Sequence, residues 1–324
     1  MAERGAPAQV LAALRPHQRF LIACHVDPDP DAVGSILAVH WLLAKLGKTS
    51  VPASPDAPPH WPTLPGFAHI ATPEAAEAAG PYDALVVVDC EPSRTGRLAA
   101  WAERLPVINI DHHVTNPGTV GTAWISPAAA ATGEMLFHLI DAAGVGVDAD
   151  VATLLYAAIM GDTGSFRYSN STPAVFDVAS KLVAAGAKPD RIADQILDTR
   201  PRTYLRLLAL VLQTFAESED GRITWLTVTP DLIARSGASP DDASGMVHFA
   251  RALSGVEVAM LYRQTGEREV KVSFRARGEI DVSAIAKSFG GGGHPKAAGC
   301  TIEASLDEAH ARVLARVRAA LGGG

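Results

Sequence analysis

Short apolar runs alternate along the first half of the chain with longer segments whose apolar residues recur at helical spacing. The runs have the length and composition of buried strands and cover residues 19–24, 84–89 and 106–110. The periodic segments predict helices at about 31–46, 132–143, 149–161, 173–186 and 201–217. The proline-rich residues 52–66 predict a loop. This alternation predicts an α/β fold, with a parallel sheet covered by helices on both faces.

The pattern changes after residue 217. Three further strands are expected at 222–229, 256–263 and 268–277, and residues 264–267 form the turn between the last two. A run of glycines and a final helix at about 305–321 complete a smaller α+β domain. The predicted domains are 1–195 and 221–324, joined by a connector at 196–220 that contains the helix 201–217.

Composition and charge narrow the functional class. The chain of 324 residues is long enough for two cores, and its 48% hydrophobic and 19% charged residues are typical of globular proteins. Neither an apolar run of membrane-spanning length nor a secretory leader pattern is visible, so we expect a cytoplasmic protein without a membrane partner. The net charge of −7 argues against long duplex nucleic acid as a partner.

Cysteine usage argues against thiolate chemistry. Cys24, Cys90 and Cys300 are far apart in the sequence and form no CxxC motif. Buried apolar residues are therefore a better interpretation than a disulfide framework or a zinc–thiolate site.

Acidic residues and a histidine cluster directly after the first predicted strand. His25, Asp27, Asp29 and Asp31 fall within seven residues. Ligand sites in open parallel sheets collect at the carboxyl ends of strands, so these side chains are candidates for a common cation. A solvated acidic turn with Asp31 as the helix N-cap explains the same residues equally well when they are taken alone.

Three more segments carry similar residues. Asp89 closes the second strand, and Asp111, His112 and His113 follow the third. Asp162 lies in the segment GDTGS at the end of a helix, where an acid opposes the helix dipole. Helix caps, surface loops and a C-terminal turn are the alternative explanations.

Together these segments indicate a metal centre. Carboxylates and imidazoles without thiolates suit Mn²⁺ or Mg²⁺, with Fe²⁺, Co²⁺ or Zn²⁺ as alternatives. The six candidate ligands are His25, Asp29, Asp31, Asp89, His112 and Asp162. Their four carboxylates would be neutralised by two divalent ions, and a neutral cluster can accept an anionic phosphate.

The segments HVDPDPDAVGS, VVVD, DHH and GDTG, in this order, resemble the four motifs of the DHH phosphoesterase superfamily. Residues 273–299 resemble its DHH-associated substrate-binding domain. Within the superfamily the chain is most similar to bacterial nanoRNase/pAp phosphatases. That group degrades very short oligoribonucleotides and 3′-phosphoadenosine 5′-phosphate, and relatives cleave cyclic di-AMP or its linear product.

The resemblance implies roles for the candidate residues. Asp89 would bridge two ions, with Asp31 and His112 on one ion and His25 and Asp29 on the other, while the side that Asp162 serves is left open. The resemblance makes His113, Asp111 and Asp89 the catalytic residues: His113 faces the phosphate and Asp111 orients the ligands from behind. Asp27 would lie outside the ligand set. Pro30 stands where the family commonly has glycine, and only a small geometric adjustment is expected. Mn²⁺ is the expected ion, with Mg²⁺ or Co²⁺ as alternatives.

The second domain offers candidate substrate contacts. Residues 290–293 are glycines whose backbone N–H groups can approach an anion, although a glycine run is also typical of a linker. His294 and Lys296 would add hydrogen bonding and charge. Ser273, Arg275 and Arg277 alternate along one strand and share a face, which a merely solvated strand would also show. The resemblance favours substrate binding by Ser273, Arg275, Arg277, Gly291, Gly292, Gly293 and His294.

These interpretations predict a two-metal phosphoesterase. It would hydrolyse oligoribonucleotides of two to five residues to mononucleotides, and 3′-phosphoadenosine 5′-phosphate to AMP, in a cleft between the domains that Arg275 and His294 close at one end. Water activated between the ions would attack without a covalent intermediate. A cyclic di-AMP or pApA phosphodiesterase is the alternative within the superfamily. A non-catalytic nucleotide-binding regulator is the alternative from another class, and the complete ligand set argues against it. The sequence leaves homodimerisation through the first domain open.

Overall fold

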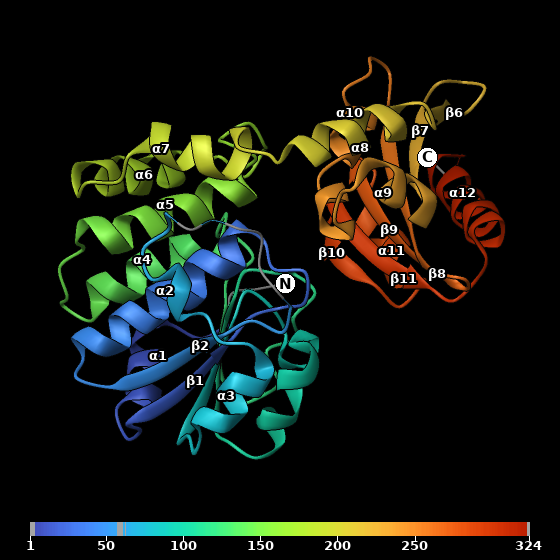
Figure 1. Cartoon of the computed structure of the whole chain (residues 1–324). Coiled ribbons are helices and arrows are strands. Elements are labelled where there is room, and N and C mark those ends of the chain that lie inside the picture. Colours follow the sequence, from blue (N-terminus) through green and yellow to red (C-terminus); the bar gives the residue numbers. More distant parts are fainter. Residues whose placement is uncertain (1–3, 57–60, 62, 323–324) are drawn as a thin grey trace. The chain divides into compact units, whose positions relative to one another are not determined.

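The computed structural model describes residues 4–56, 61 and 63–322. The chain divides into two compact units, Met1–Thr199 and Arg200–Gly324, which we describe separately (Figure 1). Helix α8 (Arg202–Leu212) covers most of the predicted connector helix, and its buried residues pack in a core of the second unit. Within the described residues, no helix has the length and apolar character needed to cross a membrane.

The first unit is built on a five-stranded parallel sheet in the order β2-β1-β3-β4-β5. Its strands are β1 (Arg19–Ala23), β2 (Thr49–Ala53), β3 (Ala84–Val88), β4 (Val107–Asp111) and β5 (Thr122–Ile125). The three strands predicted from apolar runs are therefore confirmed as β1, β3 and β4. The sheet also contains β2 and β5, which the sequence did not predict.

Strand β2 corrects part of the predicted loop at 52–66. Pro52 and Ala53 belong to this strand and pair with Ile22 and Ala23. A proline is tolerated there because β2 is an edge strand, where one side of the backbone needs no donor. Residues 57–60 and 62 of the predicted loop lie outside the described residues.

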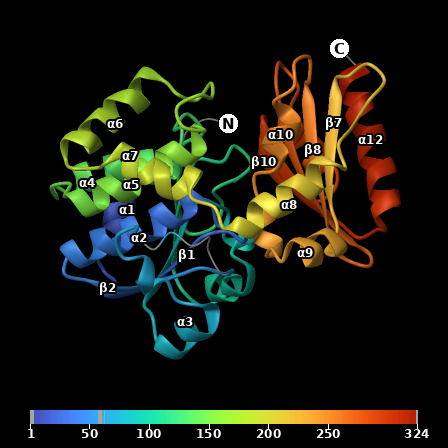
Figure 2. The same ribbon diagram turned by 45° about the horizontal axis from the view of Figure 1, so that its top comes forward.

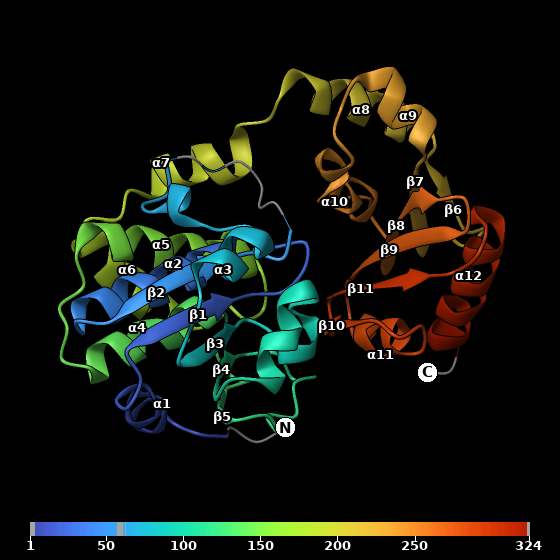
Figure 3. The ribbon, with the colours of Figure 1, turned by 60° about the horizontal axis from the view of Figure 1, so that its bottom comes forward.

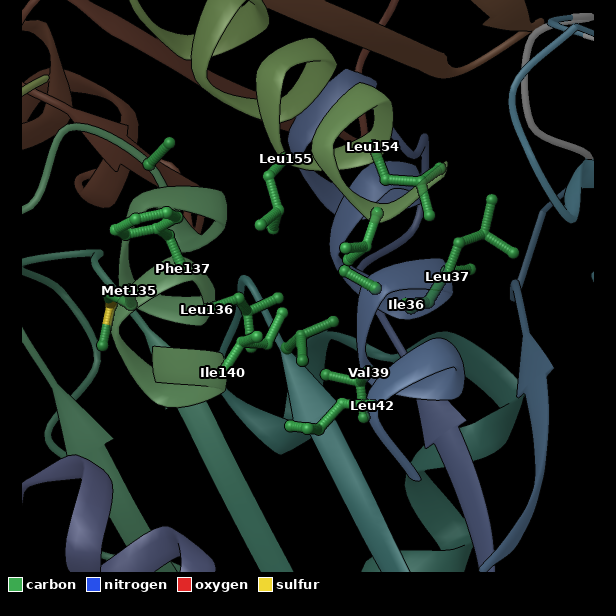
Figure 4. Packing of buried hydrophobic residues seen from close by; sticks show 14 of the residues in the cluster. Ile36, Leu37, Val39, Leu42, Met135, Leu136, Phe137, Ile140, Leu154 and Leu155 are labelled. Atoms are coloured by element: carbon green, nitrogen blue, oxygen red, sulfur yellow. The ribbon is translucent and has the colours of Figure 1, made fainter. Parts of the chain in front are cut away.

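Helices cover both faces of this sheet (Figure 2). One core contains residues of α1 (Pro7–Leu14), α2 (Pro30–Lys45), α4 (Thr132–Ala142), α5 (Ala149–Asp162), α6 (Pro173–Ala184) and α7 (Pro189–Ala193). Figure 4 shows apolar side chains of α2, α4 and α5 interlocking above the sheet. The opposite face is covered by α3 (Pro73–Ala79) and the 3₁₀ segment η3 (Gly96–Glu103). Short turns η1 (Phe67–His69), η2 (Pro92–Arg94) and η4 (Asp194–Asp198) complete the unit.

The order of the strands brings the carboxyl ends of three strands together. The chain runs from β1 outward to β2 and then returns to the other side of β1 to form β3 and β4. The carboxyl ends of β1, β3 and β4 are therefore neighbours, next to the point where the direction of winding reverses. Such a point is where open α/β sheets bind their ligands.

The second unit contains a six-stranded mixed sheet in the order β10-β11-β9-β8-β7-β6 (Figure 3). Its strands are β6 (Ala216–Glu217), β7 (Ile223–Val228), β8 (Val258–Gly266), β9 (Glu269–Ala276), β10 (Gly292–His294) and β11 (Ala297–Ile302). Helices α11 (Val282–Lys287) and α12 (Leu306–Gly322) pack on one face. The other face carries α8, α9 (Pro230–Ser236), the short turn η5 (Pro240–Ala243) and α10 (Val247–Arg251). The predicted α/β domain followed by a smaller α+β domain is confirmed.

A close contact between helices α2 and α5 fixes the distance between two segments that carry predicted metal ligands. Pro30 is the first residue of α2, and Gly161 lies next to the end of α5. A Cβ atom added to Gly161 would lie 2.8 Å from the Cβ of Pro30, which is closer than two carbon atoms can approach. Glycine at 161 therefore lets the end of α5, with Asp162, pack against the start of α2.

We predict that Gly161→Ala destabilises the first unit by about 1–3 kcal/mol, because the rigid ring of Pro30 cannot move aside easily. Four of the five tryptophans, Trp41, Trp61, Trp101 and Trp124, lie in this unit and only Trp225 lies in the second, so urea unfolding followed by tryptophan fluorescence reports mainly the stability of the first unit. Gly146→Ala is the matched control, since nothing lies within 4 Å of a Cβ atom at Gly146. Equal midpoints for the two variants would show that the contact does not constrain the helices.

Candidate metal centre

The predicted ligands converge at the carboxyl edge of the first sheet. His25 follows β1, Asp89 follows β3, and His112 follows β4. Asp29 caps the start of α2, where its Oδ1 accepts the N–H of Ala32 at 3.0 Å. Asp31 lies in the first turn of α2, and Asp162 is the last residue of α5.

His112 lies at the centre of one group of carboxylates. Its Nε2 is 3.1 Å from Asp162 Oδ2, 3.4 Å from Asp89 Oδ1 and 3.7 Å from Asp31 Oδ2. Its Nδ1 lies 3.2 Å from the carbonyl oxygen of Ala129, a contact in which the ring nitrogen must donate. This hydrogen bond directs Nε2 toward the carboxylates, as the outer hydrogen bond of a metal-binding histidine does.

His25 occupies the equivalent position on the other side of Asp89. Its Nε2 is 3.3 Å from Asp89 Oδ2 and 3.9 Å from Asp29 Oδ1. Its Nδ1 lies 2.7 Å from the carbonyl oxygen of Val26. The two carboxylate oxygens of Asp89 therefore face different imidazoles, Oδ1 toward His112 and Oδ2 toward His25.

The beginning of α4 holds two of these carboxylates in place. Asp31 Oδ2 accepts the N–H of Thr132 at 2.7 Å, and its Oδ1 accepts the N–H of Gly133 at 2.9 Å. The Thr132 hydroxyl donates to Asp89 Oδ1 at 3.1 Å, and the Ser35 hydroxyl donates to Asp31 Oδ1 at 3.1 Å. Neither Thr132 nor Ser35 was predicted from the sequence as part of the site. The only signal was the predicted helix start at 132, because the first N–H groups of a helix have no partner within it.

Burial and like charges act on the acids. Burial, with the neighbouring charges of Asp162 and Asp89, raises the pKa of Asp29 to about 6. Burial and the charges of Asp89 and Asp162 likewise raise the pKa of Asp31 well above its ordinary value. Burial also opposes ionisation of Asp89, but the imidazoles of His112 and His25 hold its pKa well below the ordinary value.

The pKa values of the two histidines are also raised, and for an imidazole a raised pKa favours the charged form. Although burial favours the neutral ring, the hydrogen bond to Asp89 and the charges of Asp29 and Asp89 raise the pKa of His25 to about 9. Asp162 and Asp89 raise the pKa of His112 well above its ordinary value against the same burial. Without a cation, protons on the imidazoles offset the charge of the acids.

The donor set fits divalent metal ions. The ligand atoms of His25, Asp29 and Asp89 lie within 4.8 Å of one another, and so do those of Asp31, Asp89 and His112. Both groups offer carboxylate oxygen and imidazole nitrogen, which suit Mn²⁺, Mg²⁺ and related ions. Because Asp89 belongs to both groups, two ions held here would share it.

Asp111 and His113 form a separate pair beside this centre. Asp111 Oδ1 accepts the backbone N–H of His113 at 3.0 Å and lies 2.7 Å from its Nδ1. Asp111 Oδ2 accepts from Asn116 Nδ2 at 2.7 Å, so both oxygens are engaged. Asp111 thus fixes the orientation of the His113 ring. Asp27, in the loop after β1, is exposed, with φ of 52°, and its N–H donates to Asp56 Oδ2 at 2.8 Å.

In the second unit, four of the predicted substrate contacts share one face of the sheet. Ser273 and Arg275 on β9 pair with Gly299 and Ala297 on β11. Those two residues pair in turn with Gly292 and His294 on β10. Directly paired residues point to the same side of a sheet, so Ser273, Arg275, Gly292 and His294 lie together.

The remaining predicted contacts are placed differently. Arg277 follows the end of β9 and is exposed, with Nη1 3.4 Å from the carbonyl oxygen of Leu253. Gly293 pairs with Ala298 and therefore faces the opposite side of the sheet from Gly292. The ammonium of Lys296 donates to the carbonyl oxygens of Gly278 and Ile280, which ties its charge to that loop.

The glycine run is partly a strand, where the sequence predicted an anion-binding loop. Gly292 and Gly293 belong to β10, and Gly291 precedes it. A Cβ atom on Gly291 would lie 2.1 Å from the carbonyl oxygen of Gly299, whereas one on Gly292 would meet nothing within 4 Å. Close packing against β11 is therefore one reason for the run.

Comparison with known proteins identifies the family. The model described as "DHH family, N-terminal domain" matches residues 19–159, and the DHHA1 domain matches residues 224–322. The bifunctional oligoribonuclease and PAP phosphatase NrnA of Thermus thermophilus is 40% identical over 313 residues, which cover 96% of this chain and 92% of that protein. The chain belongs to the DHH family. The resemblance drawn from the four motifs is therefore confirmed.

Two further proteins show how far the similarity extends. The protein of the same name from Bacillus subtilis is 24% identical over 321 residues, covering 95% of this chain and 96% of that protein. The crystal structure of an exopolyphosphatase-related protein from Bacteroides fragilis matches with a TM-score of 0.86 and 24% identity. That match covers 98% of this chain and 97% of the other, and it shows that the fold is shared.

We predict that binding of Mn²⁺ releases protons, because His25 and His112 hold protons that a cation must displace. Titration calorimetry in two buffers of equal pH but different ionisation enthalpy should therefore give different apparent enthalpies. The affinity should fall as the pH is lowered from about 8 to about 6, since protons then compete better for the imidazoles. An apparent enthalpy that does not change with the buffer would contradict this description of the centre.

Proposed function

We propose that this DHH family chain is a metal-dependent phosphoesterase. Its substrates would be oligoribonucleotides of two to five residues, which it hydrolyses to mononucleotides, and 3′-phosphoadenosine 5′-phosphate, which it converts to AMP. The observation that carries the proposal is the position of Asp89, whose two oxygens lie 3.4 Å and 3.3 Å from His112 Nε2 and His25 Nε2. The 40% identity to the oligoribonuclease and PAP phosphatase of Thermus thermophilus supports the choice of substrates.

The ligands divide between two sites in this proposal. Asp31, His112 and Asp162 would hold one ion, because Asp162 Oδ2 lies 3.1 Å from His112 Nε2. His25 and Asp29 would hold the other ion, and Asp89 would contribute one oxygen to each. Mn²⁺ is the expected occupant, with Mg²⁺ or Co²⁺ as alternatives. When bound, such ions acidify water and offset the charge of the phosphoryl group.

Two residues of the DHH motif would act on the substrate through hydrogen bonds. Asp111 is buried and receives the Nδ1–H of His113, so the carboxylate fixes how that ring is presented to a substrate. An imidazole held in one orientation would act on a phosphate oxygen as negative charge develops there. We assign this role to His113 and the orienting role to Asp111.

The second unit would select the substrate. Arg275 offers planar paired donors that suit a terminal phosphate, and His294 lies on the same face of the sheet. Ser273 and Gly292 provide smaller neighbouring groups on that face. We assign recognition of a terminal phosphate or base to this surface. Arg277, Gly291 and Gly293 would contribute to it from neighbouring positions.

We predict that Asp89→Ala lowers phosphate release from 3′-phosphoadenosine 5′-phosphate in Mn²⁺ by at least about 10³-fold, or about 4 kcal/mol of transition-state stabilisation. The substitution removes the carboxylate that both ions would share. Asp150→Ala removes an exposed aspartate at the start of α5 and should keep wild-type activity. Equal rates for wild type and Asp89→Ala would exclude the mechanism.

We also predict that a dinucleotide is cleaved at least tenfold faster than a 24-mer at equal concentration. The net charge of −7 gives no general attraction for a long polyanion, whereas a short substrate needs only the local contacts around Arg275. The measurement is initial rate under one metal condition, with cyclic di-AMP, pyrophosphate and 3′-phosphoadenosine 5′-phosphate in the same panel. Comparable rates on the dinucleotide and the 24-mer would rule out selection for short substrates.

A further inference from the structure

A buried asparagine interrupts the apolar strand β4. Asn109 is 1% exposed, and every residue of this strand is buried. Its Nδ2 donates to the carbonyl oxygens of Val87 at 3.1 Å and Cys90 at 2.8 Å. These two carbonyl groups flank Asp89, so one amide spans the turn that carries the shared metal ligand.

That turn needs support. Asp89 has φ of 61°, in the left-handed region that costs a residue with a side chain roughly 1–2 kcal/mol. Such a conformation persists only when the surrounding structure holds it. The backbone N–H of Asp89 also donates to the carbonyl oxygen of Ile110, so β4 contacts the turn through both its main chain and Asn109.

A second asparagine connects this turn to the other half of the site. Asn116 is 2% exposed, and its Nδ2 donates to Asn109 Oδ1 at 2.8 Å and to Asp111 Oδ2 at 2.7 Å. Asn116 Oδ1 accepts the backbone N–H of Gly118 at 2.9 Å. A continuous buried chain of hydrogen bonds thus runs from the Asp89 turn through Asn109, Asn116 and Asp111 to His113.

The direction of every hydrogen bond in this chain is fixed by the main chain. Two carbonyl groups can only accept, so the Asn109 amide must present Nδ2 to them and Oδ1 to Asn116. The N–H of Gly118 can only donate, so Asn116 must present Oδ1 to it and Nδ2 to its other partners. Asp111 therefore accepts the backbone N–H of His113 on Oδ1 and the Asn116 amide on Oδ2. These two hydrogen bonds fix the carboxylate in one orientation beside the His113 ring.

We propose that Asn109 and Asn116 are positioning residues that hold the Asp89 turn and the Asp111–His113 pair in one frame. Neither residue was singled out by the sequence, and neither faces the metal ligands directly. The kinetic consequences rest on the proposed function, whereas the consequences for metal affinity do not. Outer hydrogen-bond partners of this kind typically change metal affinity or activity by about 10–100-fold when they are removed.

The two residues have separable effects. Asn109 contacts the turn of Asp89, so its loss weakens Mn²⁺ binding as well as turnover. Asn116 touches Asp111 but no residue of that turn, so its loss lowers kcat and leaves Mn²⁺ affinity nearly unchanged. A network that served only the stability of the fold would not separate metal affinity from turnover in this way.

The test uses Asn109→Leu and Asn116→Leu in the full chain, because leucine has the same branched arrangement of heavy atoms and removes the hydrogen bonds. Asn109→Ala and Asn116→Ala replace them if a leucine variant does not fold by circular dichroism. Thr224→Val is the control for loss of a buried hydroxyl elsewhere, since Thr224 donates to the carbonyl oxygen of Ala250 in the second unit. Each protein is measured for kcat and KM on 3′-phosphoadenosine 5′-phosphate, for Mn²⁺ affinity by calorimetry and for melting temperature.

We expect the Asn116 variant to lose about 10–100-fold in kcat, with KM and the Mn²⁺ dissociation constant within about threefold of wild type. The Asn109 variant should in addition raise the Mn²⁺ dissociation constant by about tenfold or more. The control should lose stability without either effect. Retention of kcat by the Asn116 variant, or of Mn²⁺ affinity by the Asn109 variant, would overturn the proposal.

An error in the proposed function would give a different result from an error in the role of the asparagines. A wild-type protein that hydrolyses none of the phosphate esters would remove the function and the kinetic readout together. The Mn²⁺ affinity of the Asn109 variant would still show whether the asparagine positions the shared ligand, because that measurement needs no turnover.

Discussion

Mutual repulsion among closely placed carboxylates is the constraint on which the rest of the first unit depends. Asp29, Asp31, Asp89 and Asp162 are brought to one edge of a sheet whose strands are almost entirely apolar. Burial and like charge both oppose the ionisation of Asp29 and Asp31, as the raised pKa values of these two residues show. The fold offsets this cost with the imidazoles of His25 and His112, with the N–H groups at the start of α4 and with a site suited to cations.

The topology makes this concentration of charge achievable. The strand order places the ends of β1, β3 and β4 side by side, and each strand contributes a ligand from the residues that follow it. The contact between Pro30 and Gly161 then draws the end of α5 to the start of α2. Pro30 therefore has a packing role here, because its ring rests on Gly161.

A second layer of polar residues gives the site its rigidity. Thr132 joins Asp31 to Asp89 from one side, and Asn109 and Asn116 join the Asp89 turn to Asp111 from the other. Fully satisfied buried networks of this kind specify one arrangement of their members, since each misplaced group would lose a partner in a dry environment. In the second unit, close packing constrains the glycine run, because Gly291 packs directly against the main chain of Gly299.

The sequence by itself determined the strands β1, β3 and β4, the helices α2, α4, α5 and α6 and the motifs that gave the family. These features depend on local periodicity and on residues close together in the chain, such as Asp111, His112 and His113. Only the tertiary structure decided which distant groups meet. The N–H of Thr132 lies 101 residues from the Asp31 carboxylate that it serves, and Asn109 lies 22 residues from Val87. The same limit explains why β2, β5, β6, β10 and β11 were missed, since a short strand is defined by its neighbours across the sheet and not by its own composition.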